Sequence, residues 1–169
     1  MKKVSFAEMR CSLARSLDLI GDWWTPLIVR DVYLGVTRFD DIAEDLGISR
    51  NLLTRRLGHL CDKDVLRREA YQIRPARHDY LLTQSGLELV PVILALTAWG
   101  DRWVQPAEGQ PIRFVHTTCG ESLVPAVTCS SCGEAIHASD VLALPGPGGA
   151  DGPGTKVLAG RLRGGQIAR

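Results

Sequence analysis

Apolar positions between residues 38 and 83 recur in a pattern that predicts a helix, a tight turn, a second helix and a hairpin. In the first helix Phe39, Ile42 and Leu46 stand at i, i+3 and i+7, which is the spacing of one apolar helical face. Gly47 follows, and a residue without a Cβ permits a sharp turn. The pattern therefore predicts two short helices joined by a tight connection.

The second helix carries an apolar stripe and an opposite polar face. Ser49 is a suitable N-cap, and Leu53, Leu57 and Leu60 form the buried stripe. The residues of the polar face are Arg50, Asn51, Thr54 and Arg55. In the major groove, arginine can pair bidentately with guanine and asparagine with adenine. This helix, beginning at Ser49, is therefore predicted to read DNA bases.

Two runs after this helix predict the strands of the hairpin. They are Leu66–Ala70, which residues 71–73 can extend, and Tyr80–Leu82. Pro75 interrupts strand pairing and suits a hairpin tip. The tip is basic, with Arg74, Arg77 and His78. Basic side chains at a hairpin tip are typical of a wing that contacts phosphates or the minor groove.

Further helices are predicted on both sides of this unit. One covers residues 5–20, and another begins at Thr25-Pro26 and ends at Gly35. Thr83 is expected to cap a last helix, in which Pro91 predicts a kink or a break. The part over residues 92–103 has more apolar surface than one small core needs. A second subunit is expected to cover it, and closure of the chain's own core is the alternative.

Charge is distributed unevenly along the 169 residues, although the net charge is only +1. Residues 49–80 carry eight Lys or Arg against four acids, whereas residues 81–150 carry two Arg against six acids. Positive charge is thus concentrated on the proposed reading unit. No apolar run follows Met1-Lys2-Lys3, and none reaches membrane-spanning length, so a cytoplasmic protein without membrane contact is expected.

Cysteine usage indicates a metal site rather than disulfides, because five cysteines is an odd number in a chain without an evident leader. His116 and Cys119, and then Cys129 and Cys132, each form a ligand-x-x-Cys-Gly knuckle. One imidazole and three thiolates suit a tetrahedral, structural Zn²⁺. A reversible thiol switch and a metal-free relic are the alternatives, and His137 is a competing ligand.

Composition divides the chain into three parts. Residues 1–105 hold the helices and the hairpin, and residues 112–142 hold the cysteine knuckles. Residues 145–169 are Pro/Gly-rich at their start and are predicted to be a disordered tail. The predicted fold class is mainly α (α+β), with a small zinc-ribbon-like β module.

Many ordered positions of residues 10–104 carry a resemblance to the HxlR-type transcriptional regulators, a branch of the MarR-like winged-helix proteins. They are Cys11, Leu17-Asp18-Leu19-Ile20-Gly21-Asp22-Trp23-Trp24-Thr25, Leu34-Gly35, Arg38-Phe39, Leu46-Gly47-Ile48-Ser49, Leu53-Thr54-Arg55-Arg56-Leu57, Arg74-Pro75, Tyr80-Leu81-Leu82-Thr83, Gly86, Leu89, Pro91 and Trp99-Gly100. The resemblance implies a winged helix that dimerises through its first and last helices. The zinc-ribbon-like extension lies outside the shared core.

Some members of this family use a cysteine at the position of Cys11 to sense oxidants, quinones or aldehydes. Cys11 stands near a predicted helix start and beside Arg10 and Arg15, where a thiolate would be stabilised. A buried structural cysteine is the alternative, and Ser12 stands where the family commonly has proline. An apolar pocket near Trp23, Trp24 or Trp99 could instead take a small aromatic effector, although core packing is favoured for these tryptophans.

Together these patterns predict a homodimeric, sequence-specific DNA-binding regulator that acts on an inverted repeat and responds to a redox, electrophilic or small aromatic effector. An adaptor that binds proteins but not specific DNA is the alternative. The sequence has no G-x-S-x-G motif, no P-loop and no metal site with an open position, so no enzyme is expected.

Overall fold

The computed structural model describes residues 5–164 and divides the chain into two compact units. One comprises residues 24–133, and the other combines residues 1–23 with residues 134–169. Residues 1–4 and 165–169 lie outside the described part, so the expectations for Met1-Lys2-Lys3 and for the end of the tail lie there too. Within the described part, no helix is long and apolar enough to cross a membrane.

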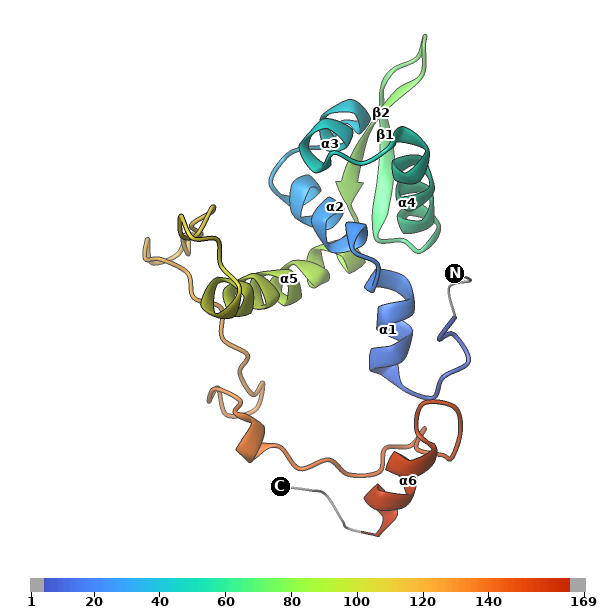
Figure 1. Ribbon diagram of the computed structural model, residues 1–169, viewed down its shortest axis with the longest axis vertical. Helices are drawn as coiled ribbons and strands as arrows, with labels where there is room; N and C mark the ends of the chain where they lie inside the picture. The colour runs from blue at the N-terminus through green and yellow to red at the C-terminus, as the bar shows by residue number, and fades with distance from the viewer. Residues whose placement is uncertain (1–4, 165–169) are drawn as a thin grey trace. The chain divides into compact units, whose positions relative to one another are not determined.

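The unit of residues 24–133 contains the predicted order of three helices, a hairpin and a further helix (Figure 1). Its elements are α2 (Trp24–Tyr33), α3 (Phe39–Leu46), α4 (Arg50–Asp62), β1 (Leu66–Gln72), β2 (Arg77–Leu82) and α5 (Gln84–Trp103). Helix α2 packs against α3, α4, α5 and β2, and α4 packs against β1. This is a predominantly helical winged helix-turn-helix fold with a two-stranded sheet, as the sequence predicted.

The apolar stripe predicted for α4 forms the centre of the core. Leu53, Leu57 and Leu60 are fully buried, as are Ile28 of α2 and Ile42 of α3, and α2 packs against both α3 and α4. Five large side chains removed from water in one cluster supply the main driving force for this small unit. The helix pair is therefore fixed by burial of the residues that define its period.

One acid lies in this core. Asp31 of α2 is only 2% exposed, and its Oδ1 accepts hydrogen bonds from Nε and Nη2 of Arg30 at 2.8 and 2.6 Å. Burial raises the pKa of the Asp31 carboxyl, and the Arg30 guanidinium partly opposes that rise. Its Oδ2 has no hydrogen-bond partner among the described residues.

The turn between α3 and α4 uses the predicted residues, but with different contacts. Gly47 has φ +59°, in the left-handed region that favours glycine, and its N–H donates to Glu44 O. Ser49 occupies the N-cap position of α4 with an extended backbone, yet its side chain makes no capping hydrogen bond. The N-cap prediction is correct in position and wrong in mechanism, because only the Ser49 carbonyl, accepting from Leu53 N, begins the helix.

The second strand of the hairpin is longer than predicted, because it begins at Arg77 rather than at Tyr80. The first strand ends at Gln72, within the extension that the sequence allowed. Pairing shifts register between Ala70 and Gln72, so the intervening Tyr71 forms a bulge. Arg77 and His78, predicted at the tip, are therefore the first residues of β2, and the tip itself is residues 73–76.

The segment that precedes α3 is attached to the outer edge of β2. Tyr80 N–H donates to Thr37 O at 2.8 Å, and Thr37 Oγ1 donates to Asp79 Oδ1 at 2.7 Å. Arg38 and Asp79 also form an antiparallel bridge. Helix α3 and the hairpin are thereby joined by both backbone and side-chain hydrogen bonds.

Helix α5 begins as predicted. Thr83 Oγ1 accepts a hydrogen bond from Gly86 N at 3.2 Å and also contacts Val65 O at 3.1 Å. The predicted break at Pro91 is absent, because α5 continues from Gln84 to Trp103. A proline removes only one hydrogen bond of the helix, and the rest of this 20-residue element remains continuous.

The other unit contains α1 (Ser12–Ile20), a short 3₁₀ turn (Ala138–Asp140) and α6 (Lys156–Arg163). The first helix starts at Ser12 rather than at residue 5. The Asp18 carboxylate accepts hydrogen bonds from Phe6 N and Ser5 Oγ, which hold the preceding segment beside α1 instead of extending it. Helix α6 lies where the Pro/Gly-rich composition predicted no order.

The cysteine-containing segment has little regular structure. Across residues 112–142, the described chain shows isolated bridge residues, among them the paired Val115 and Ser122, and the 3₁₀ turn, but no strand. Phe114 is half-buried and lines small hollows beside α2 and α5. The β structure of a zinc ribbon is not shown.

Candidate nucleic-acid interface

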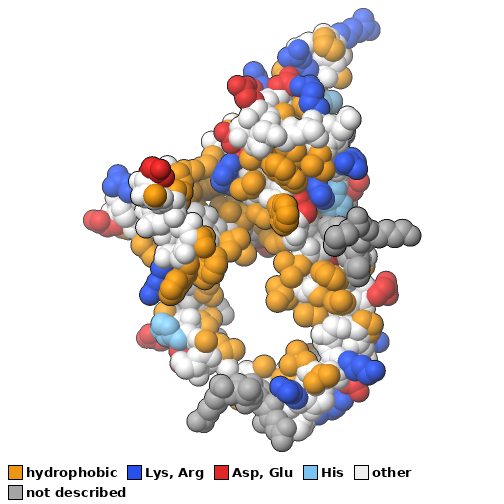
Figure 2. All heavy atoms as spheres, viewed as in Figure 1, with side chains coloured by type: hydrophobic (Ala, Val, Ile, Leu, Met, Phe, Trp, Pro, Cys, Tyr) orange, Lys and Arg blue, Asp and Glu red, His pale blue; other side chains and the backbone are white. Residues whose placement is uncertain are grey.

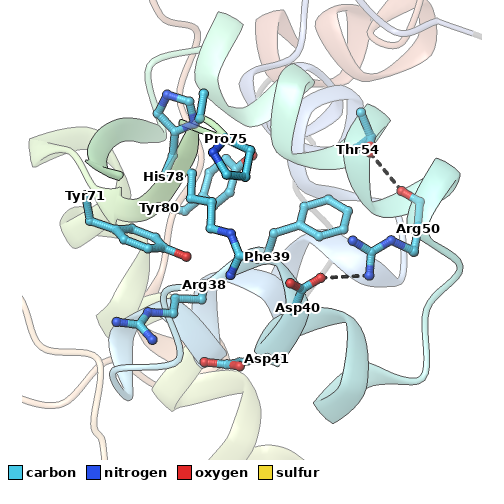
Figure 3. A pocket seen from close by; sticks show the side chains of 12 residues that line it. Arg38, Phe39, Asp40, Asp41, Arg50, Thr54, Tyr71, Pro75, His78 and Tyr80 are labelled. Carbon is cyan, nitrogen blue, oxygen red and sulfur yellow. Dashed lines mark hydrogen bonds and ion pairs between the residues drawn. The ribbon is translucent and has the colours of Figure 1, made fainter. Parts of the chain in front are cut away.

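An open hollow of about 490 Å³ lies between the start of α3, the start of α4 and the hairpin (Figure 3). We call it the wing hollow. Its lining is mainly basic and aromatic, with Arg38, Phe39, Arg50, Tyr71, Arg77 and His78, and it also includes the acids Asp40 and Asp41. A concave, cationic and aromatic surface that connects an exposed helix to a hairpin is suited to a polyanion.

The predicted reading face of α4 is open to solvent. Its members Arg50, Asn51, Thr54 and Arg55 are all exposed. Thr54 Oγ1 donates to Arg50 O at 2.9 Å within the helix, so this hydroxyl keeps only its acceptor capacity. Within residues 5–164, the Asn51 and Arg55 side chains form no hydrogen bond or ion pair, which leaves their donors available to a ligand.

Arg50 differs from its neighbours on the reading face because it is already engaged. Its Nη1 lies 2.7 Å from Oδ1 of Asp40, in the first turn of α3. The guanidinium carbon also lies 5.0 Å from the centre of the Phe39 ring. Figure 3 shows the Arg50 side chain directed from α4 toward α3. The sequence did not predict this pair, because the two residues lie ten positions apart in different helices.

The hairpin supplies positive charge at and near its end. Lys and Arg side chains are visible at the extremity of the hairpin in Figure 2. Arg74 is exposed in the tip, and Arg77 and His78 follow at the start of β2. The three predicted basic residues therefore stay together, although two of them belong to a strand.

Arg38 and Tyr71 are further interface candidates that the sequence reasoning did not assign. The Arg38 guanidinium lies 4.8 Å from the centre of the Tyr71 ring, and its Nε lies 3.9 Å from Asp79 Oδ1. Cation–π contact with an exposed ring orients the guanidinium beside the wing hollow. The bulge at Tyr71, which allows this contact, has no local sequence signature.

Cys11 lies at the N-cap position of α1 and is partly buried. It lines a hollow of about 450 Å³ together with Arg10, Arg15 and residues of the segment 145–162. The two arginines predicted beside the thiol are therefore near it. All five cysteines are free thiols in this structure.

The two predicted metal-binding knuckles form separately. His116 Nδ1 lies 3.3 Å from Cys119 Sγ. In the second knuckle, hydrogen bonds from the Ser131 and Cys132 backbone lower the pKa of the Cys129 thiol. Among residues 5–164, however, no three His, Cys, Asp or Glu side chains are grouped so that they could hold one metal ion. The donor types suit zinc, but the two halves are not assembled into one site.

Helix α5 presents a large apolar surface to solvent. Only Gly86 and Val90 of this helix are buried. Leu96, Trp99 and Trp103 are 57%, 56% and 65% exposed, and Figure 2 shows hydrophobic side chains open to solvent along the helix. Helix α1, which belongs to the other unit, has no buried residue. Apolar side chains of this size gathered on one surface mark an interaction site.

A helix-turn-helix whose second helix is polar and exposed, flanked by a basic hairpin, defines a winged-helix DNA-binding protein. A family model described as HxlR-like helix-turn-helix matches residues 19–108, more than half of the chain. The chain therefore belongs to the HxlR family of helix-turn-helix transcriptional regulators. The resemblance inferred from the sequence is confirmed for this core.

Relatives agree with this assignment. The uncharacterized HTH-type transcriptional regulator Rv3095 of Mycobacterium tuberculosis is 43% identical over 137 residues, covering 81% of this chain and 87% of that protein. The family model ends at residue 108. An alignment of 137 residues is longer than that by 29, so at least 29 of its residues lie in the extension that follows. Similarity to this relative thus continues beyond the winged helix.

Two solved structures share the fold. PA1607, crystallised as a candidate transcription factor, is 31% identical with a TM-score of 0.72, covering 83% of this chain and 98% of that one. The oxidized form of the redox regulator HypR is 28% identical, with a TM-score of 0.52. The match covers 57% of this chain and 100% of the HypR chain. The structural likeness to PA1607 also includes more than the winged helix.

Proposed function

We propose that this HxlR-family regulator binds a specific inverted-repeat operator as a homodimer, with α4 of each subunit in the major groove. The observation that carries the proposal is the exposed reading face of α4 beside the wing hollow. Asn51 and Arg55 have free donors that match adenine and guanine edges. Arg74, Arg77 and His78 would hold the adjacent backbone or minor groove, which fixes the register of α4.

Dimerisation would use the apolar surface of α5, together with α1. A two-fold dimer places two reading helices about one DNA turn apart, which is why an inverted repeat is expected. The exposed Leu96, Trp99 and Trp103 support this part of the proposal, because their burial would remove a large apolar area from water.

Effector response is the third part of the proposal. HypR is named a redox regulator in both its reduced and oxidized forms. Cys11, partly buried beside Arg10 and Arg15, is the candidate sensing thiol in this chain. A small aromatic effector bound near α5 is the alternative.

Structural zinc is the fourth part. His116, Cys119, Cys129 and Cys132 would hold one ion if the two knuckles approached each other. The ion would crosslink the extension and contribute to its folding.

Duplexes selected from a random pool by the full chain provide the direct test of DNA recognition. Fluorescence anisotropy would compare the tightest selected duplex with a scrambled duplex over a range of salt concentrations. We expect a salt-sensitive preference for the selected duplex that is weakened about fivefold or more by Arg55→Ala, since a bidentate base contact contributes about 1–3 kcal/mol. Arg113→Ala, which removes an exposed arginine of the extension, should keep the preference.

Absence of any salt-dependent binding would refute DNA recognition and favour the protein-interaction adaptor, because phosphate contacts always make affinity fall with salt. An oxidant arm, repeated with Cys11→Ser, tests the sensing thiol. If oxidation weakens binding equally in both proteins, Cys11 is not the sensor.

A further inference from the structure

Asp40 is an acid in a surface otherwise suited to DNA. It lies in the first turn of α3, lines the wing hollow and is paired with Arg50 of α4 at 2.7 Å. Both side chains are mostly exposed, at 59% for Asp40 and 70% for Arg50. An exposed ion pair contributes little to fold stability. Its position in the hollow therefore points to a role other than stabilisation.

The pair controls the direction of the Arg50 side chain. Asp40 holds the guanidinium from one side, and the Phe39 ring lies 5.0 Å from the guanidinium carbon. Arg50 is consequently directed across the hollow toward α3 (Figure 3). Long arginine side chains normally sample many rotamers, and two simultaneous contacts restrict that sampling.

The Asp40 carboxylate also imposes an electrostatic cost on any duplex that enters the hollow. Phosphates repel it, and they compete with it for the Arg50 guanidinium. A duplex recovers this cost only if it offers Arg50 a well-aligned acceptor in place of the carboxylate, such as the paired acceptors of a guanine edge. A sequence that offers only loosely placed phosphates does not.

We propose that Asp40 is a specificity-determining positioning residue that acts through Arg50 and weakens binding to non-cognate DNA more than binding to the operator. The proposal rests on the DNA-binding function proposed above. It also assigns different roles to the residues of α4. Asn51 and Arg55 contact bases directly, whereas Arg50 leaves Asp40 only when the duplex offers a matching acceptor. Repulsion built against wrong partners is a general route to specificity.

Asp41 provides a matched control. It neighbours Asp40 in the first turn of α3 and is also exposed. Among the described residues, its side chain has no ion pair or hydrogen bond. Replacing either acid by asparagine changes the net charge equally and removes one favourable charge from the same helix N-terminus. Only Asp40→Asn releases Arg50.

A double-mutant cycle measures the effect. The readout is the ratio of dissociation constants for a scrambled and a selected duplex, taken for the full-length wild type, Asp40→Asn, Asp41→Asn, Arg50→Ala and Asp40→Asn/Arg50→Ala. We expect Asp40→Asn to lower this ratio about tenfold and to steepen the salt dependence by roughly one ion per subunit. Asp41 also lines the hollow but holds no arginine, so Asp41→Asn should relieve repulsion for both duplexes alike and change the ratio less than about threefold.

The coupling between Asp40 and Arg50 in the double-mutant cycle decides the question. In the Arg50→Ala background, Asp40→Asn should produce no further loss of discrimination, because its target is absent. Arg50→Lys, which keeps the charge without the planar fork, should lose discrimination while the salt dependence remains close to that of the wild type. Circular dichroism of each variant confirms that the fold is retained.

The possible failures are distinguishable. If the wild type shows no preference between the duplexes, the proposed function fails, and this inference fails with it. If the wild type discriminates but Asp40→Asn behaves like Asp41→Asn, only the role of Asp40 is refuted. An Asp40→Asn effect that persists without Arg50 would also refute it, because Asp40 would then act by charge alone.

Discussion

Gly86 lies where α5 closely approaches the backbone of Val65, just before β1, and its substitution by alanine tests that contact. A Cβ added at Gly86 would lie 2.3 Å from Val65 O and 2.9 Å from Leu82 Cδ2. To reach even the 3.0 Å minimum seen for real Cβ contacts, α5 or the start of the sheet must move by about 0.7 Å. That shift would disturb the bond from Gly86 N to Thr83 Oγ1.

The expected cost follows from two opposing effects. Alanine favours a helix by about 1 kcal/mol relative to glycine. Overpacking against a rigid backbone oxygen costs about 1–3 kcal/mol or more, and loss of the N-cap bond adds about 1 kcal/mol. We therefore expect Gly86→Ala to lower the free energy of unfolding by about 2 kcal/mol.

Gly100→Ala supplies the comparison, since it is the same substitution in the same helix. There the nearest atom to an added Cβ is Val104 Cγ2 at 3.8 Å, an ordinary van der Waals contact. Helix propensity should then dominate and raise stability by about 0.5–1 kcal/mol. Urea denaturation followed by tryptophan fluorescence, at one fixed protein concentration, measures both variants. The reasoning is refuted if Gly86→Ala is as stable as Gly100→Ala.

Three other predictions concern charge, assembly and metal. Because burial raises the pKa of Asp31 above its ordinary value of 3.8, the folded state binds more protons than the unfolded state, and ionised Asp31 opposes folding above that pH. A pH series of urea denaturations should therefore show Asp31→Asn gaining stability relative to the wild type as pH rises from about 3.8 toward neutrality; a pH-independent difference would contradict this. Trp99→Glu should shift sedimenting dimers toward monomers, because it places a charge on an apolar face. Leu144→Glu, at a residue that is also exposed, should leave the dimer intact. A dimer unchanged by Trp99→Glu would exclude the α5 face as the interface. Elemental analysis should find about one zinc per chain, lost in Cys119→Ser and kept in Cys61→Ser, and zinc that survives Cys119→Ser would exclude the proposed ligand set.

The helical core could be predicted from the sequence because its determinants are local. Leu53, Leu57 and Leu60 repeat with the helical period, and they are buried as expected. Gly47 adopts the left-handed turn, and Thr83 caps α5, because backbone conformation and capping depend on single residues in short range.

What the sequence did not predict depends on contacts between distant segments. Helix α1 starts seven residues later than predicted because Asp18 binds the backbone of the preceding segment. The bulge at Tyr71 and the pairing of Asp40 with Arg50 arise only when α3, α4 and the hairpin have packed together. The reading-face residues were thus identifiable from periodicity, whereas the side chains that orient them were not.

The attachment of Thr37 to β2 has a consequence for how this protein would select DNA. Since the segment before α3 is hydrogen-bonded along the hairpin edge, the hairpin cannot swing away from the helix pair without breaking those bonds. The distance between the reading face of α4 and the hairpin tip is then nearly constant. A duplex whose groove width does not match that distance must bend or twist to bind. The energy of that deformation depends on base steps that no side chain touches. Sequences beside the contacted bases would therefore be ranked by their mechanical compliance.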